Sequence, residues 1–329
     1  PLYSSAASDV YKRQDPNQEI TTDASETGWG AWTQLLETSG FWSSTERVQS
    51  NNFRELQAGV LGVQALAHHN SKSLHHLLLN MDNTTAVAYI NKQGGRIPLL
   101  HQTAQNFLFW MKKNKMTIQA KYLPGIHNTR ADRLSRKKLD RNDWQLNPQV
   151  FSQIIHLWGT PLIDLFASRL NHQVPRFISR YKDPKASGTD AFQISWPRGL
   201  LYANPPFSLV GKVIQKLRQE KLFILRAPLW TSALWFPLLL HLNQTRPILL
   251  PQRPDLLLPV SKGHSSPIGN PNWRLAAWLI SWKHFNNKEY SKTLWKYSHT
   301  DGKQGLHLPM IAIGKDGRNS VRNITYTLS

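Results

Sequence analysis

The sequence has no cysteine among its 329 residues, and its 20 acidic residues are only half as many as its 40 Lys and Arg residues. The lack of cysteine excludes disulfides, iron–sulfur clusters, cysteine-ligated zinc and thiol nucleophiles, so a bound metal would need oxygen or imidazole ligands. Long apolar runs are also missing. Residues 222–242 are about one membrane span long, but Arg226, Pro228, Pro237 and His241 interrupt them. We therefore expect a soluble protein that works through carboxylates, amides and aromatic side chains.

Positive charge is what the sequence has in excess. The net charge is +20, with 17 basic and 12 acidic residues in 1–147 against 23 and 8 in 148–329. Phosphate neutralisation with counterion release rewards such an excess, so nucleic acid is the expected partner. We expect the acids of the first half to serve chemistry and the bases of the second half to contact phosphates. A basic surface that serves only solubility would show the same excess.

Length and a hydrophobic content of 40% suggest about two compact domains. The start lacks a targeting signal and an initiator Met, so we expect an intracellular fragment of a longer product, in the cytoplasm or the nucleus. The expected segments are a disordered or artefactual leader (1–17), a first domain (18–136), a linker (137–148), a second domain (149–282) and a basic, poorly ordered tail (283–329).

Hydrophobic periodicity predicts a mixed α/β sheet in the first domain. The expected elements are a hairpin in 20–32, a strand at 40–45, a helix capped by Asn51 or Asn52, a strand at 77–81, helices at 84–91 and 98–111, and a strand at 117–123. The second domain is expected to be a largely parallel α/β sheet. Its predicted strands are 161–167, 199–202 and 222–225, and its predicted helices are 209–217 and 232–240.

Four acidic residues of the first domain are expected at strand ends or on helix faces: Asp23, Glu55, Asp82 and Asp132. Two of them terminate apolar strands, where an unpaired charge is costly. A divalent cation would supply a partner, and two Mg²⁺ ions can activate a water and stabilise the leaving oxygen of a phosphodiester. The alternative is that these acids are ordinary caps and surface charges. The histidine pairs at 68–69 and 75–76 are interpreted as structural or exposed rather than as metal ligands.

Four motifs follow one another along residues 18–136: TDAS (22–25) with GWG (28–30), REL (54–56), MDNTT (81–85), and PGIHN (124–128) with ADRLSR (131–136). In this order they resemble the ribonuclease H domain of retroelement polyproteins. The resemblance implies a two-Mg²⁺ site at Asp23, Glu55, Asp82 and Asp132. It also implies cleavage of the RNA strand of RNA/DNA hybrids, with strand choice through the 2′-hydroxyls. Many relatives carry His where this chain has Tyr122.

In the second domain, Asn204-Pro205-Pro206-Phe207 follows a predicted strand and precedes a predicted helix, at the sheet edge where open α/β folds bind ligands. The Asn204 side-chain oxygen and the Pro205 carbonyl can accept hydrogen bonds from an exocyclic amino group and so prepare it to attack a methyl sulfonium. Phe207 can stack on a base swung out of the helix, and the two prolines stiffen the loop. The alternative is a structural turn in a domain that only binds DNA.

Further motifs surround this loop, namely GTP (159–161), DLFAS (164–168), Asn171, TDA (189–191), Trp196, APLW (227–230) and WF (235–236). Together they resemble the Dam-like adenine methyltransferases, which implies a Rossmann-like fold. Asp164 and Asn204 would then line an S-adenosylmethionine pocket, with Asp190 as a further candidate, and residues 204–207 would hold the adenine. Many methyltransferases have glycines after the first strand, whereas residues 164–168 have none, and bulk there would narrow the pocket.

The two resemblances together look like the polyprotein of DIRS-like tyrosine-recombinase retrotransposons, in a fragment that lacks the reverse transcriptase expected as a partner. Two other hypotheses remain open. The chain is a nucleic-acid-binding protein whose catalytic functions have decayed, or the first domain is active and the second only positions the hybrid.

Overall fold

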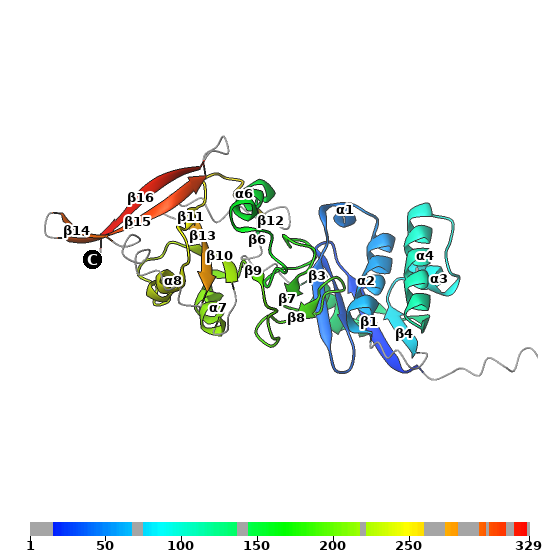
Figure 1. The fold of residues 1–329 in the computed structure, drawn as a ribbon. Helices are drawn as coiled ribbons and strands as arrows, with labels where there is room; N and C mark the ends of the chain where they lie inside the picture. Colours follow the sequence, from blue (N-terminus) through cyan, green and yellow to red (C-terminus); the bar gives the residue numbers. More distant parts are fainter. Residues whose placement is uncertain are drawn as a thin grey trace, which may run out of the picture. The chain divides into compact units, whose positions relative to one another are not determined.

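The computed structural model describes residues 16–67, 75–136, 144–217, 222–259, 274–281, 296–300, 303–313 and 319–327. The chain divides into two compact units (Figure 1). Unit 1 comprises Pro1–Leu139 with Tyr181–Pro184, and unit 2 comprises Asp140–Arg180 with Lys185–Ser329. Most of the expected leader, the histidine pair at 68–69 and most of the expected linker lie outside the described residues.

Unit 1 is built on a five-stranded mixed sheet with the strand order β3-β2-β1-β4-β5. The first three strands pair antiparallel, and β4 runs parallel to both β1 and β5. The predicted mixed α/β sheet is confirmed. Its strands are β1 (Gln18–Ala24), β2 (Gly28–Trp32), β3 (Glu37–Phe41), β4 (His75–Met81) and β5 (Met116–Tyr122).

The helical segments of unit 1 are α1 (Ser44–Arg47), α2 (Asn51–Leu66), α3 (Thr84–Asn91), α4 (Pro98–Lys113), the single turn η1 (Gly125–His127) and α5 (Thr129–Ser135). Short polar side chains cap α1, α2 and α3, whereas α4 begins without a side-chain cap. The prediction that Asn51 or Asn52 caps α2 is wrong, because the hydroxyl of Ser50 accepts the hydrogen bond from the Phe53 backbone N–H. The expected strand at 40–45 ends early because Ser43 and Glu46 form a capping box that begins α1.

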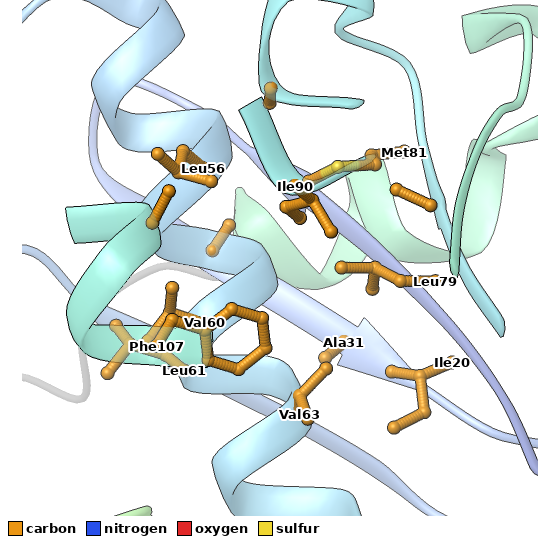
Figure 2. Close-up of a cluster of buried hydrophobic side chains, with 14 of the residues drawn as sticks. Ile20, Ala31, Leu56, Val60, Leu61, Val63, Leu79, Met81, Ile90 and Phe107 are labelled. Carbon is orange, nitrogen blue, oxygen red and sulfur yellow. The ribbon is translucent and has the colours of Figure 1, made fainter. Parts of the chain in front are cut away.

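The two faces of the unit 1 sheet carry different helices. A Cβ atom on Gly30 would lie 2.5 Å from the Leu134 side chain of α5, whereas one on Gly62 of α2 would lie 2.8 Å from the Ala31 side chain. Because neighbouring strand residues point to opposite faces, α5 covers one face of β2 and α2 covers the other. On the α2 side, Figure 2 shows side chains of α2, α3 and α4 gathered with those of β1, β2 and β4 in one apolar core.

Unit 2 contains a seven-stranded sheet in the order β14-β15-β11-β13-β10-β9, with β16 paired to β15. Its strands are β9 (Leu200–Ala203), β10 (Leu222–Pro228), β11 (Ile248–Leu249), β13 (Leu275–Ser281), β14 (Lys296–Thr300), β15 (Lys303–Ile313) and β16 (Asn319–Thr327). Two small sheets pair β6 (Trp144–Leu146) with β12 (Leu257–Pro259) and β7 (Ile178–Ser179) with β8 (Gly188–Thr189). The helical segments are α6 (Pro148–Trp158), η2 (Phe207–Leu209), α7 (Val210–Lys216) and α8 (Phe236–Leu242). Within the described ranges, every helix is too short or too polar to pass through a bilayer.

The prediction of a largely parallel second sheet is wrong. β9 and β10 are parallel, but β13 pairs antiparallel with both β10 and β11. The apolar stretch LAAWLIS of β13 is buried at every position, so it enters the middle of the sheet as a strand that was not anticipated. The Rossmann-like arrangement expected from the resemblance is therefore not confirmed.

Three further expectations for unit 2 differ from the structure. Residues 161–167 form no continuous strand, and only Asp164 bridges to Phe177 and Tyr202. The helix expected at 232–240 begins at Phe236, with Pro237 in its first turn. The tail expected to be poorly ordered (283–329) contains β14, β15 and β16, in which β15 and β16 pair over nine positions and Met310 is fully buried.

Candidate metal centre

Three of the four predicted carboxylates of unit 1 meet in space. Asp23 lies near the end of β1, Glu55 in the first half of α2, and Asp82 directly after β4. One ligand atom from each residue lies within 4.8 Å of the other two. Parallel pairing of β1 and β4 brings the ends of the two strands together, and the adjacent helix α2 supplies the third group. We call Asp23, Glu55 and Asp82 the carboxylate cluster.

The cluster is buried and short of internal partners. Asp23 and Glu55 are each 4% exposed, whereas Asp82 is only partly buried. Among the described residues, Asp23 Oδ2 and Glu55 Oε2 have no hydrogen-bond partner. Buried polar atoms are normally paired, and orphaned carboxylate oxygens call for a proton or a cation.

Burial and mutual repulsion make these carboxyl groups weak acids. Burial first, and then the charges of Asp82 and Asp132, raise the pKa of Asp23 to about 6 against a hydrogen bond from Ser135. Burial likewise raises the pKa of Glu55 to about 9, with the charges of Asp82 and Asp23 adding to the effect. The pKa of Asp82 is raised mainly by burial. Without a cation, Glu55 holds its proton at neutral pH.

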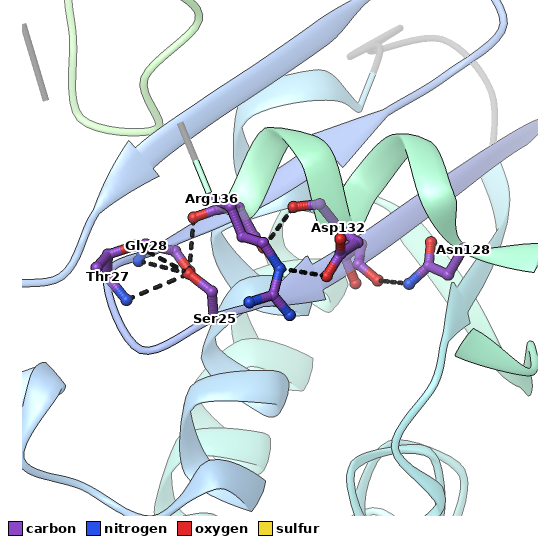
Figure 3. Close-up of polar contacts among 8 residues, drawn as sticks. Ser25, Thr27, Gly28, Asn128, Asp132 and Arg136 are labelled. Carbon is purple, nitrogen blue, oxygen red and sulfur yellow. Dashed lines mark hydrogen bonds and ion pairs between the residues drawn. The ribbon is translucent and has the colours of Figure 1, made fainter. Parts of the chain in front are cut away.

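The fourth predicted acid, Asp132 on α5, is not among the three residues whose ligand atoms lie within 4.8 Å of one another. Its Oδ1 accepts a hydrogen bond of 2.6 Å from Nε of Arg136, one helical turn later (Figure 3). Asp132 nevertheless lies near enough for its charge to raise the pKa of both Asp23 and Asp82. The structure therefore brings three predicted ligands together and leaves the fourth beside them, paired with an arginine.

Two polar contacts fix α5 to β1 and its turn, and the sequence analysis gave these residues no role. The Ser25 hydroxyl donates to the Ser135 carbonyl at 2.7 Å, and Asn128 Nδ2 donates to the Thr22 carbonyl at 3.0 Å (Figure 3). Asn128 is 1% exposed. Both residues stand inside the quoted motifs, so short polar side chains at fixed offsets from Asp23 and Asp132 were the available signal.

The residues of the cluster fit a divalent cation. Mg²⁺ prefers oxygen ligands, and the cluster offers carboxylates from three segments, with two oxygens that lack partners in the part of the chain that the structure describes. A cation would also offset the burial and the mutual repulsion that together raise the three pKa values. The turn after β5 closes against the site, since a Cβ atom on Gly125 would lie 3.3 Å from Asp82 Oδ2.

In unit 2, the Asn204-Pro205-Pro206-Phe207 loop follows β9 and leads into η2 and α7, as the sequence predicts. Its polar end is turned toward the protein. Asn204 Nδ2 donates to the Trp144 carbonyl at 3.1 Å, and Asn204 Oδ1 accepts a hydrogen bond from Nε of Arg226. The guanidinium of Arg226 also lies over the Phe207 ring, 5.3 Å from its centroid.

Asp164 bridges to Tyr202 of β9, the strand before this loop, and its side chain is also engaged by the protein. It is 1% exposed, and its two oxygens accept the backbone N–H groups of Phe166 and Gln173 at 3.3 and 3.2 Å. Burial raises its pKa to about 7, against these hydrogen bonds and the charge of Arg226.

Asp190, the weaker pocket candidate, uses its Oδ1 to accept the Phe192 N–H at 2.9 Å. The side chains of Asp164, Asp190 and Asn204, which the resemblance assigns to the S-adenosylmethionine pocket, thus each make hydrogen bonds within the protein.

No protein-family model matches the chain, and no curated protein matches it. Solved structures of ribonuclease H domains do resemble part of it. One is the crystal structure of LC11-RNase H1 in complex with an RNA/DNA hybrid, with 19% identity and a TM-score of 0.31, covering 36% of this chain and 92% of that one. Another is the N-terminal ribonuclease H domain of a Mycobacterium tuberculosis protein fused to maltose-binding protein, with 19% identity and a TM-score of 0.26, covering 36% and 90%.

Proposed function

We propose that unit 1 is a ribonuclease H that hydrolyses the RNA strand of RNA/DNA hybrids. The observation that carries the proposal is the carboxylate cluster, in which three acids from separate elements converge with two buried oxygens lacking partners among the described residues. Bound there, two Mg²⁺ ions would supply an activated water and stabilisation of the leaving oxygen. The ligands would be Asp23, Glu55 and Asp82, joined by Asp132.

The chain's own groups support this role in specific ways. Glu55 keeps a proton in the absence of a cation and would give it up when one binds, because its pKa is raised to about 9. Asp82 is the most exposed member of the cluster, so it marks the side open to a substrate. The basic excess of the chain suits a polyanionic substrate.

The test is cleavage of a labelled RNA/DNA hybrid in Mg²⁺ by the full chain and by Asp82→Asn. The wild type should cut the RNA strand, and the variant should lose at least about 100-fold in rate, more than the loss of an outer-shell partner causes. Glu37→Gln is the matched control, since it also removes one negative charge, from an exposed ion pair with Arg130. Equal cutting by the wild type and Asp82→Asn would reject the proposal. Cutting of DNA duplexes would reject the RNA/DNA hybrid as the substrate.

For unit 2 we propose nucleic-acid binding without methyl transfer. This proposal agrees with the hypothesis that the second half positions the hybrid. The supporting observation is that Arg226 engages the acceptor oxygen of Asn204. Calorimetry with S-adenosylmethionine should show no binding, while salt-sensitive binding of nucleic acid should remain. Binding of S-adenosylmethionine that Asn204→Ala abolishes would overturn this proposal. An origin in a retroelement polyprotein that also carries a reverse transcriptase remains a hypothesis from the motifs.

A further inference from the structure

Arg136 directly follows α5 and places a positive charge near the candidate metal centre. Its side chain is 66% exposed, and its Nε binds Asp132 Oδ1 at 2.6 Å. Its charge acts on Asp23 as well, since it lowers the pKa of that residue against the effect of burial. An exposed positive charge therefore lies beside the carboxylate cluster and pairs with the one predicted ligand that is outside it.

The backbone of Arg136 is fixed although its side chain is exposed. Its N–H donates to the Asp132 carbonyl at 3.1 Å, and the preceding residue, Ser135, accepts the Ser25 hydroxyl at 2.7 Å (Figure 3). These contacts anchor the last turn of α5 to the turn after β1. A rotation of the Arg136 side chain would thus move the guanidinium without moving Asp132 or the sheet.

The Arg136–Asp132 pair competes with cation binding. Asp132 Oδ1 accepts the guanidinium at 2.6 Å, which occupies one of its lone pairs and places a positive charge beside it, so a metal ion binds less favourably at that oxygen. An exposed ion pair of this kind is worth little, so a divalent cation can displace it. A displaced guanidinium keeps its planar donors, which match a phosphate group well.

We propose that Arg136 is a positioning residue that holds Asp132 away from the carboxylate cluster until a cation enters, and then binds a phosphate of the nucleic acid next to the site. This inference rests on the proposed function. It adds a role for a side chain outside the acidic set, and it predicts opposite effects of one substitution on cation binding and on substrate binding.

The first test is calorimetric titration of the full chain with Mn²⁺ in the absence of nucleic acid. Arg136→Gln should bind the cation about two- to fivefold more tightly than the wild type, since an exposed pair no longer competes. Arg133→Gln is the matched control, because it removes the same charge from an exposed position on the same helix. If Arg136→Gln binds Mn²⁺ no more tightly than Arg133→Gln does, the inference is overturned. It is also overturned if the wild type binds no Mn²⁺.

The second test is steady-state cleavage of the hybrid in saturating Mg²⁺. Arg136→Gln should raise KM several-fold with a smaller change in kcat, and Arg136→Lys should restore part of the lost affinity by keeping the charge. A fall in kcat at unchanged KM would contradict the phosphate contact. If the cation affinity shifts as expected but the wild type cuts no hybrid, the proposed function fails while the pairing role stands. If the wild type cuts and neither readout moves, only this inference fails.

Discussion

At the scale of single residues, the buried carboxyl groups of unit 1 act against the stability of the fold. Asp23 and Glu55 are each 4% exposed, and each has an oxygen without a partner among the described residues. Taking a charge out of water costs several kcal/mol unless a partner offsets it. A proton offsets that cost at low pH and a divalent cation at high pH, so stability and cation binding are coupled at this site.

Asp23→Asn should therefore stabilise the cation-free protein while it removes the activity. At pH 8 in a chelator, the free energy of unfolding of unit 1 should rise by about 1–3 kcal/mol, because the raised pKa of about 6 measures the cost of the charge. Urea unfolding measures the first effect and hybrid cleavage the second. Glu37→Gln, at an exposed ion pair, should change stability by less than about 0.5 kcal/mol. A destabilised but active Asp23→Asn protein would refute this coupling.

The pH dependence of stability follows from the same two groups. Both folded-state pKa values, about 6 for Asp23 and about 9 for Glu55, lie above the ordinary values of 3.8 and 4.5. The folded protein thus binds more protons than the unfolded chain, and the stability from these groups is lost as the pH rises from about 4 to 9. Mg²⁺ should raise Tm strongly at pH 8 and hardly at all at pH 4, as followed by circular dichroism. An equal rise in Tm at both pH values would show that Mg²⁺ binds at another site.

In unit 2, Arg226 is a buried cation whose Nε donates to the half-buried Asn204. It is 3% exposed, and burial lowers its pKa to about 10 while the charges of Tyr202 and Asp164 oppose that shift. Arg226→Met leaves Asp164 without a countercharge and Asn204 without a donor, so it should cost about 3–5 kcal/mol of stability. Arg246→Met, at an exposed position, is the control and should cost little. Equal unfolding midpoints for the two variants in urea would contradict this assignment.

At the scale of elements, the packing of α5 against β2 determines the position of Asp132. A Cβ atom on Gly30 would lie 2.6 Å from the Ala131 carbonyl oxygen and equally close to the Ser135 backbone nitrogen. Backbone atoms cannot yield to such a contact as a flexible side chain would, so only glycine suits this position.

Gly30→Ala should accordingly destabilise unit 1 by about 1–3 kcal/mol and reduce cleavage by displacing α5. Gly59→Ala on α2 is the comparison. There the closest atom is the flexible end of Met81, and alanine also favours the helix, so a smaller loss is expected. Thermal unfolding and cleavage rates of both variants check the contrast. A larger loss for Gly59→Ala would show that α5 is not seated as described.

Periodicity predicted the existence of α2, α3 and α4 because each presents an apolar stripe, and it located the ends of β1 and β4 where Asp23 and Asp82 stand. It predicted the hairpin of β1 and β2 but not the strand pairing of unit 2. The buried run of β13 carries no signal for its antiparallel place between β10 and β11, since an apolar strand reads alike in either direction. The pairing of Arg136 with Asp132 also escaped the sequence analysis, because a residue four positions away on a helix can equally face solvent.

At the scale of the whole molecule, the sequence alone shows that the basic excess is larger in the second half, and its length predicts about two domains. The chain divides into two compact units. The ends of those units depend on tertiary contacts, since Tyr181–Pro184 groups with unit 1 although it follows α6 in the chain. Salt-sensitive binding of nucleic acid is expected of an active enzyme and of a decayed one, because both keep the basic excess. Occupancy of the carboxylate cluster separates the two.

The most direct measurement is therefore anomalous diffraction from crystals of the full chain soaked in Mn²⁺. An active centre predicts anomalous density about 2.1 Å from carboxylate oxygens of Asp23 and at least one of Glu55 and Asp82. It also predicts an Asp132 carboxylate released from Arg136. Well-ordered carboxylates with no anomalous density between them, at Mn²⁺ concentrations that saturate the calorimetric titration, would contradict the metal centre and with it the proposed nuclease.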